Sequence, residues 1–430
     1  MSDVNRRTFL AGAGSGAAAL ALGSGTRAAG PNDRLRVAVI GFNGRGQSHI
    51  DAFTADRRTT VATLCDVDTR LFDKAAASVE SKGGARPECV QDLRRVFDDK
   101  TIDVVSIATT NHWHALATVW ACQAGKDVYV EKPVSHNFLE GRKMVEAARK
   151  HGRVVQTGTQ SRSMKGIAEG IAFLRSGGIG TVYLAKGLCY KPRGSIGHKA
   201  DAAVPAGVDY NLWLGPAPER PFNPNRFHYE WHWNWDYGNG DLGNQGIHQM
   251  DIARWGLGKE GWPTAITGSG GRFGYKDDGE TPNTELCTYR FDDAELVFEV
   301  RGLATNAEQG VKVGNIFYGT KGILTINGNR WATFLGEASK TLEPGPKGDG
   351  GGDHFGNFID AVLARDPKAL HSEIVEGHRS SALCHLGNIA YRTGRALKFD
   401  GATETFLGDA PANALLGREY RSPFTMPEKV

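Results

Sequence analysis

Short apolar runs alternate with amphipathic segments in the part of the chain that follows residue 30. The segments 112–125 and 137–151 have the apolar spacing of helices, and the first ends at a glycine. The runs with the composition of buried strands are 36–40, 60–65, 103–108, 127–130 and 153–157. Strands that alternate with helices form parallel sheets with helices on both faces. We therefore expect an α/β Rossmann domain, a doubly wound parallel sheet, over residues 31–157.

A glycine-rich turn follows the first of these strands. Gly41 and Gly46 hold the first and third places of a G-x-G-x-x-G pattern, and Asn43 holds the second. Asn tolerates a positive φ better than most residues, and Gly44 next to it allows a close approach. With Arg45, the turn brings backbone N–H groups and a helix N-terminus to a pyrophosphate. The pattern predicts a dinucleotide site.

Asp66 ends the second strand, about 20 residues after the glycine turn. A carboxylate at this place accepts hydrogen bonds from a ribose and repels a 2′-phosphate, so we expect NAD. Arg70 is close enough in sequence to leave NADP open. The alternative interpretation makes Asp66 the N-cap of the segment that follows it.

Two further groups of residues follow strand ends. They are Thr109 to Asn111 and Glu131 to Pro133. The carboxyl ends of parallel strands meet at one edge of a sheet, where ligands of this fold bind. We expect both groups to line one crevice with the glycine turn, and Pro133 to be preceded by a cis bond.

Three segments resemble the Gfo/Idh/MocA family, which includes glucose–fructose oxidoreductase and inositol dehydrogenase. Residues 110–114 are close to its P-N-x-x-H element, 125–133 match G-K-x-V-x-x-E-K-P, and 240–251 are similar to its glycine-rich D-x-x-x-H-x-x-D stretch. Thr110 replaces the proline of the first element. Asn244 stands where the family often has Asp, and an amide cannot act as a general base.

The resemblance implies a second domain, here 158–430, with a large, open, mostly antiparallel sheet. It also implies a homodimer or homotetramer. Helices are expected at 354–364 and 371–393. The strand-like runs of this half are 181–190, 284–291, 295–301, 312–318 and 322–327.

The activity that the resemblance implies is hydride transfer between NAD(P) and a CH–OH group of a sugar, sugar derivative or polyol. Lys132 follows a strand end beside the expected nicotinamide, where burial lowers its pKa and lets it act as base. His248 is the expected acid/base partner. The alternatives are a surface Lys132 that starts a loop and a His248 satisfied in the core. Asp251 is expected to be structural.

The remaining candidates are assigned by function. The aromatic-rich segment before His248 offers faces for sugar rings, although it is equally suited to core or interface packing. The substrate candidates are Asn244, Trp231, His232, Trp235 and Tyr237, with His228 nearby. The cofactor candidates are Gly41, Asn43, Gly44, Arg45, Gly46, Asp66, Thr109, Asn111, His114, Glu131, Lys132 and Gln160.

The first 30 residues have the features of an export signal. Arg6 and Arg7 precede Phe9 and Leu10, then a short Gly/Ala-rich apolar stretch and small residues. The paired arginines resemble a twin-arginine signal, and the stretch is too short to cross a bilayer. We expect a periplasmic or otherwise exported protein without stable membrane insertion. The alternative is a disordered basic N-terminus.

Composition excludes several classes of function. The net charge of +3 in 430 residues gives no reason to expect a nucleic-acid partner. The six cysteines form no C-x-x-C pair, and no metal-ligand spacing appears, so we predict no metal.

Export also bears on the mechanism. A compartment without free NAD requires a tightly bound cofactor that is restored to its starting redox state within the site. We expect either paired oxidation and reduction of two sugars or transient oxidation of one. A rival hypothesis is an NAD-dependent glycosidase or lyase with no net redox change.

Overall fold

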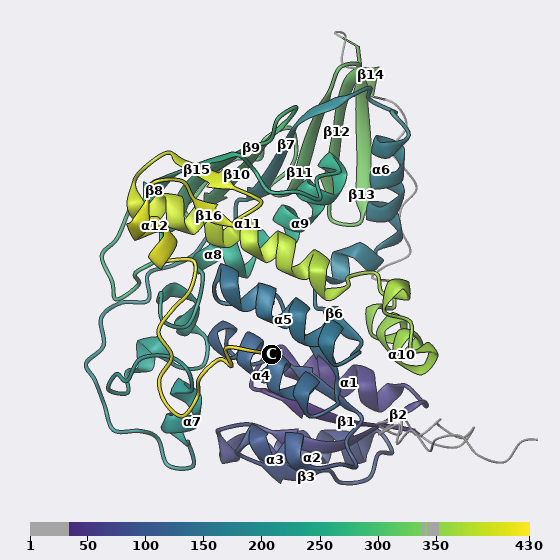
Figure 1. The fold of residues 1–430 in the computed structure, drawn as a ribbon, viewed down its shortest axis with the longest axis vertical. Helices are drawn as coiled ribbons and strands as arrows, with labels where there is room; N and C mark the ends of the chain where they lie inside the picture. Colours follow the sequence, from purple (N-terminus) through teal and green to yellow (C-terminus); the bar gives the residue numbers. More distant parts are fainter. Residues whose placement is uncertain (1–33, 337–339, 342–351) are drawn as a thin grey trace, which may run out of the picture. The chain divides into compact units, whose positions relative to one another are not determined.

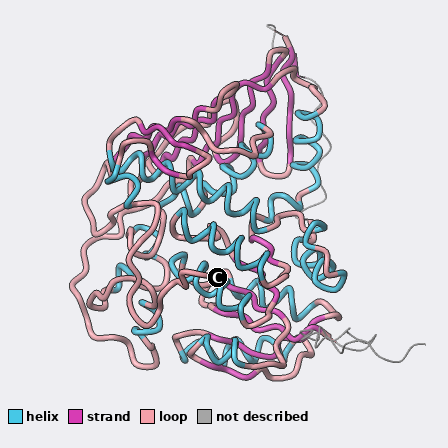
Figure 2. Tube along the Cα trace, in the orientation of Figure 1, coloured by secondary structure: helices cyan, strands magenta, loops and turns pink. Residues whose placement is uncertain are grey.

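The computed structural model describes residues 34–336, 340–341 and 352–430, so the predicted export signal lies outside the described residues. Two β-sheets dominate this part of the chain, with helices between them (Figures 1 and 2). The strands form one six-stranded sheet and one ten-stranded sheet.

The six-stranded sheet is parallel, in the order β3-β2-β1-β4-β5-β6. This order matches the Rossmann arrangement, whose crevice opens where the strand order reverses, between β1 and β4. The strands are β1 (Leu35–Ile40), β2 (Thr59–Cys65), β3 (Glu88–Val90), β4 (Val104–Ile107), β5 (Asp127–Val130) and β6 (Val155–Thr157). Their continuous apolar runs are buried because helices cover both faces.

The two faces of this sheet carry separate cores. One face is covered by α1 (Gly46–Ala55), α2 (Phe72–Ser81) and α10 (His354–Ala364). The other is covered by α3 (Leu93–Asp98), α4 (Asn111–Gln123) and α5 (Phe138–Lys150). Phe358 packs in the first core and Phe424 in the second. Residue 157, where we expect the first domain to end, is the last residue of β6. Residues from the C-terminal part of the chain nevertheless pack into both cores of the Rossmann sheet.

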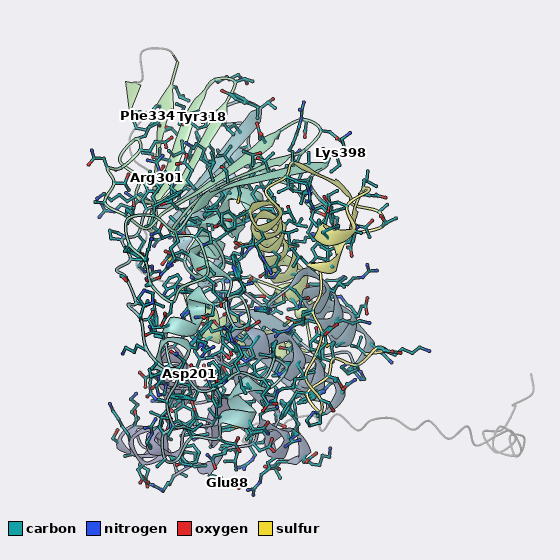
Figure 3. The ribbon with its side chains drawn as sticks, turned by 90° about the vertical axis from the view of Figure 1, so that its left-hand side faces the viewer. Glu88, Asp201, Arg301, Tyr318, Phe334 and Lys398 are labelled. Atoms are coloured by element: carbon teal, nitrogen blue, oxygen red, sulfur yellow. The ribbon has the colours of Figure 1, made fainter. Side chains whose placement is uncertain are left out.

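The ten-stranded sheet is antiparallel except for the parallel pair β7 and β10. Figure 3 labels Phe334 on β13 and Lys398 on β15, near opposite ends of this sheet. Its strands are β7 (Val182–Cys189), β8 (Ala265–Gly271), β9 (Thr284–Arg290), β10 (Glu295–Arg301), β11 (Val313–Gly319), β12 (Gly322–Asn327), β13 (Arg330–Leu335), β14 (Lys340–Thr341), β15 (Leu397–Asp400) and β16 (Thr405–Phe406). The expected large, mostly antiparallel sheet is confirmed, and it also contains β8 and β13 to β16, which were not predicted.

Helices fill the space between the sheets. α9 (Gly246–Leu257) and α11 (Ile374–Thr393) lie between the ten-stranded sheet and α5 (Figure 1). α6 (Lys165–Arg175) packs on β12 and β13, and α12 (Ala410–Ala414) follows β16. The segment from 190 to 240 is mostly loop, with α7 (Tyr210–Leu214), short 3-10 turns and the start of α8 (Gly240–Asn244). α9 packs on the ten-stranded sheet, and its residue His248 lies near the ends of the Rossmann strands.

Candidate functional site

One cavity of about 520 Å³ lies against the carboxyl ends of the Rossmann strands. This volume suits a small-molecule or cofactor site. Its walls bring together most of the predicted site residues from both halves of the chain. These are Gly41, Asn43, Gly44, Arg45, Asp66, Thr109, Asn111, His114, Glu131, Lys132, Gln160, Trp231, His232, Asn244 and His248.

The glycine turn has the geometry of a dinucleotide cradle. Gly41 has φ +80°, and a Cβ there would lie 2.9 Å from the Thr109 backbone. A Cβ on Gly46, which starts α1 outside the cavity lining, would lie 2.0 Å from the Gly41 carbonyl. A Cβ on Gly44 would meet no protein atom within 4 Å, so this edge faces open space where a pyrophosphate fits. Asn43 does not have the left-handed backbone that we considered for it.

Asp66 is oriented toward the turn and is not an N-cap. Its carboxylate accepts hydrogen bonds from the Phe42 N–H at 2.9 Å and the Asp68 N–H at 3.1 Å. The cap of the following 3-10 turn is Asp68, whose carboxylate also pairs with Arg70 at 2.6 Å. Arg70 is thus neutralised, and Asp66 on the cavity wall favours a ribose diol over a 2′-phosphate. The arrangement supports NAD.

Burial raises the pKa of Asp66 to about 6, although the two backbone N–H groups oppose the rise. Ribose hydroxyls donate to the ionised carboxylate, so protonation competes with cofactor binding. We expect NAD affinity to be constant above pH 7 and to fall up to about tenfold per pH unit below pH 6. Calorimetric titration of cofactor-free protein with NAD across pH 5–8 measures this. Asp66→Asn is expected to bind NAD more weakly and to lose the fall in affinity below pH 6. A pH-dependent fall that persists in this variant would contradict the assignment.

Glu131 is buried behind the glycine turn, where it is hydrogen-bonded to exposed Arg45 and buried His49. It accepts hydrogen bonds from Arg45 Nε at 2.9 Å and His49 Nε2 at 3.1 Å, and His49 Nδ1 lies 2.8 Å from Ser106 Oγ. Burial opposes ionisation, but the His49 hydrogen bond and the Arg45 charge hold the pKa of Glu131 well below its ordinary value. Burial lowers the pKa of His49, so a neutral ring donates to Glu131. This cluster fixes Arg45 and the backbone before Lys132. His49 carried no sequence signal.

Lys132 points into the cavity between the two halves of the chain. Its Nζ donates a hydrogen bond to the backbone carbonyl of Asn244 at 2.9 Å, and its own N–H donates to Glu131. The Lys132–Pro133 bond is cis. Burial lowers the pKa of Lys132, and the Glu131 charge works against this shift. The amine of Lys132 therefore has a fixed orientation in the cavity, and Lys132 is not a surface residue. Asn244 lines the wall and also positions Lys132 through its backbone carbonyl.

His248 lines the same cavity from α9. Its Nδ1 is buried, and no described residue is hydrogen-bonded to it. Burial, helped by the Lys132 charge, lowers the pKa of His248 to about 3, so the ring is neutral at working pH. An uncharged imidazole beside a lysine amine gives the site one base and one hydrogen-bonding partner for a single hydroxyl group. The ring is not satisfied in the core by protein groups.

Three further residues predicted to bind the cofactor, His114, Asn111 and Gln160, line the cavity. His114 contacts the Pro133 carbonyl with Nδ1 at 2.7 Å and the Thr109 carbonyl with Nε2 at 3.1 Å, which ties two strand-end loops together. Asn111 starts α4 and donates to Asn239 Oδ1 at 3.0 Å. Gln160 lines the wall with a buried Oε1 that has no protein partner.

A segment that we call the strap, residues 207–233, lines the cavity and is attached to the residues that follow Asp66. It is anchored by Asp209 N–H to the Val67 carbonyl at 2.9 Å and Thr69 N–H to the Gly207 carbonyl at 3.0 Å. At its far end His228 Nδ1 lies 2.9 Å from Asn43 Nδ2, and His228 Nε2 lies 3.4 Å from Asp68. The strap thus joins the glycine turn to the residues after β2. His228 also lines the cavity, and its expected contact with substrate stays a prediction.

The aromatic candidates divide into two groups. Trp231 and His232 line the cavity and stack on each other, with ring centroids 3.6 Å apart. Tyr237 is fully buried in a core cluster with Trp213, so its predicted substrate contact needs correction. Trp235 also needs correction, because it lines a different cavity beside Arg392. Side chains of a loop have no regular periodicity, so the sequence does not predict which of these aromatic residues face the same cavity.

Asp251 has the structural role expected for it. Its carboxylate pairs with Arg162 Nε and Nη2, both at 2.8 Å, and accepts a hydrogen bond from Ser380 at 2.7 Å. Arg162 also contacts Glu376 at 3.1 Å. Asp251 belongs to α9, and Glu376 and Ser380 belong to α11, so the cluster fixes the helix that carries His248.

Residues 34–336, 340–341 and 352–430 contain no group of three or more His, Cys, Asp or Glu side chains arranged to hold a metal ion. Within the same ranges, every helix is too short or too polar to cross a membrane.

Several known proteins are similar to this chain. A glycosyl hydrolase family 109 protein of Shewanella pealeana is 29% identical over 134 residues, 28% of this chain and 29% of that protein. The inositol 2-dehydrogenase of Salmonella typhimurium is 27% identical over 172 residues, 40% of this chain and 50% of that protein. The matches thus span half or less of these relatives. Levoglucosan dehydrogenase, solved with NADH and L-sorbose, has a TM-score of 0.64 at 18% identity over 85% of this chain and 99% of its own.

Two family descriptions match most of the sequence. "Oxidoreductase family, NAD-binding Rossmann fold" matches residues 35–159, and "Oxidoreductase family, C-terminal alpha/beta domain" matches residues 187–426. The chain therefore belongs to the Gfo/Idh/MocA oxidoreductase family, with its NAD-binding Rossmann domain and its C-terminal α/β domain.

Proposed function

We propose that this protein oxidises a CH–OH group of a sugar, sugar derivative or polyol with NAD. The observation that carries the proposal is that Lys132 and a neutral His248 face one cavity with the glycine turn and Asp66. The inositol dehydrogenase and levoglucosan dehydrogenase described above act on substrates of this class.

The residues divide the reaction between them. Burial lowers the pKa of Lys132 and so favours the neutral amine, and the hydrogen bond to the Asn244 carbonyl orients this amine to take the hydroxyl proton. His248 would hydrogen-bond the same oxygen and hold the reacting carbon in place. Trp231 and His232 offer an aromatic surface to the C–H face of a ring. The nicotinamide, when bound, accepts the hydride from that carbon.

The experiment begins with the protein as purified. The cofactor is released by denaturation and identified by mass spectrometry, and intact protein is then tested against a panel of sugars and polyols while the absorbance of reduced nicotinamide is recorded. NAD together with reduction by one member of the panel supports the proposal. A panel that yields no reduced cofactor, with NAD present, contradicts it.

The rival function is redox-neutral glycoside cleavage, and the similarity to glycosyl hydrolase family 109 proteins supports considering it. Asn244 in place of the family's Asp also weakens the case for net oxidation. Aryl glycosides separate the two activities. Release of phenol without accumulation of NADH indicates cleavage, whereas NADH without phenol indicates a dehydrogenase.

We infer that the cofactor is retained between turnovers and that the protein is exported by the twin-arginine route to the periplasm. The paired arginines at the N-terminus support export, and twin-arginine substrates are already folded. The strap supports retention, because His228 connects Asn43 of the glycine turn with Asp68, and the adenosine of a bound NAD is expected between them. A retained cofactor is then recycled by a second substrate or by re-reduction of the first.

Loss of the His228 bridge is expected to release the cofactor faster. His228 has φ +58°, a conformation that Asn tolerates, and an Asn side chain is too short to keep both contacts. His228→Asn should raise the NAD dissociation rate about tenfold, since two hydrogen bonds of about 1 kcal/mol each are weakened. Stopped-flow displacement measures the rate. His198→Asn, at an exposed histidine paired with Asp278, is the control and should leave it unchanged.

We also propose that the protein is a homodimer or homotetramer. The outer face of the ten-stranded sheet supports this, because Tyr183 on β7 and Leu286 on β9 are large apolar residues exposed there. Sheet faces of this kind are suited to self-association. Light scattering of the full chain measures the mass.

A further inference from the structure

A second cavity of about 300 Å³ has His136 and Asn137, a few residues after Lys132, in its wall. Five segments contribute to its wall: the loop that precedes α5, Pro218, residues 235–239, the C-terminal half of α11, and the end of α12 with the chain that follows it. The end of α11 and α12 lie together at the left of Figure 1. Its volume is at the lower end of the range for small-molecule sites.

Three residues of the wall each carry a buried polar atom without a protein partner. His385 and Asn388 are 3% and 4% exposed, and their Nδ1 and Oδ1 atoms respectively form no hydrogen bond. His136 Nε2 is also unpaired, while its Nδ1 lies 3.2 Å from Arg418. Because Arg418 donates to Nδ1, the ring of His136 presents a donor at Nε2. Buried donors and acceptors are rarely left unpaired, so their clustering at one cavity indicates a polar occupant.

The charges at this cavity specify the occupant further. Arg392 and Arg418 both line it, and no described carboxylate lies within ion-pair distance of either. Asp236 on the same wall is already paired with Arg220 at 2.7 Å, and exposed Glu419 is the other acidic group of the lining. Arg392 is stacked on the Trp235 ring, 4.9 Å from its centroid, so its guanidinium is positioned in advance. Two guanidinium groups bind a carboxylate through paired N–H donors.

We propose that the second cavity is a binding site for a small hydroxylated carboxylate of the sugar-acid class. Arg392 and Arg418 bind the carboxylate, and His136, His385 and Asn388 bind the hydroxyl groups. This ligand has the chemistry of an oxidised sugar, but the proposal does not depend on the reaction in the first cavity.

The second cavity is connected to the first by one side chain. Asn239 accepts a hydrogen bond from Asn111 at 3.0 Å and donates to the His136 carbonyl at 2.9 Å. The backbone carbonyl of Asn239 also accepts a hydrogen bond from Asn388 Nδ2 at 3.0 Å. Asn111 lines the first cavity, so a ligand held by Asn388 and His136 contacts groups that position the strand-end loops.

Calorimetric titration of the holoprotein with D-gluconate tests the site. We expect saturable binding with one ligand per chain and at least tenfold weaker binding of D-glucose, which has the hydroxyls without the carboxylate. Arg392→Gln and Arg418→Lys are each expected to weaken gluconate binding at least fivefold. The matched control is Arg395→Gln, just beyond the end of α11, because Arg395 pairs with Asp409 outside the cavity.

Lys132→Met distinguishes the two cavities. If gluconate binds only beside Lys132, this variant weakens binding while the arginine variants do not, and the proposal is overturned. Absence of binding, or binding that all four variants leave unchanged, also overturns it. Failure to oxidise any sugar contradicts the proposed function but leaves this result intact, since gluconate binding is measured without turnover.

Discussion

Replacing Lys132 by methionine is expected to lower kcat/KM by about 10³-fold or more, with NAD affinity changed less than threefold. Methionine keeps the length of the side chain and removes the amine that takes the hydroxyl proton, and a positioned base contributes about 10²–10⁴ in rate. Loss of the hydrogen bond to the Asn244 carbonyl adds to the effect, because that bond orients the amine. The measurement is single-turnover reduction of the bound cofactor by the substrate that the sugar panel identifies.

Arginine at position 132 separates charge from base function. It keeps a cation and cannot be deprotonated at working pH, so Lys132→Arg should be about as inactive as Lys132→Met. Lys74→Met, at an exposed lysine on α2, is the control and should match the unaltered protein. If Lys132→Arg retained most of the rate, the role of residue 132 would be electrostatic and the proposed base would be wrong.

Five of the six Rossmann strands were predictable because their signal is local, whereas the three-residue strand β3 was missed. Parallel strands buried on both faces are continuous apolar runs, and β1, β4 and β5 lie within a residue of the expected bounds. The functional groups at strand ends follow from this topology, since it places Gly41, Asp66 and Lys132 at one edge. A single local pattern thus determines both the sheet and the order of residues along the crevice.

Contacts between distant segments were not predictable. His49 supports Glu131 from α1, and His228 meets Asn43 and Asp68 across more than a hundred residues of chain, through a loop without periodicity. Lys132 is held by a backbone carbonyl, which every residue type offers, so no sequence pattern marks it. Strand β8 was missed because it is rich in glycine and serine.

Glutamine at position 285 is expected to stabilise the protein in alkaline solution and to change little in acid. Glu285 lies on β9, 3% exposed, and faces α11 with Cys287 Sγ at 3.5 Å as its hydrogen-bond partner. Lys, Arg and His side chains of the described residues lie beyond ion-pair distance from it. Burial raises the pKa of Glu285 from about 4.5 to about 8.

The sign follows from proton linkage. A folded-state pKa above the unfolded value means that the favourable contribution of protonated Glu285 is complete below pH 4.5. It is lost progressively as the pH rises through about 8. At about 1.36 kcal/mol per pKa unit, the loss amounts to about 4–5 kcal/mol at pH 9, and Gln avoids it because it has no charge to bury. Urea unfolding of Glu285→Gln at pH 5 and pH 9 measures the difference. Glu295→Gln, at an exposed position on β10, should show no such pH dependence, and equal effects of Glu285→Gln at both pH values would show that Glu285 is ionised throughout.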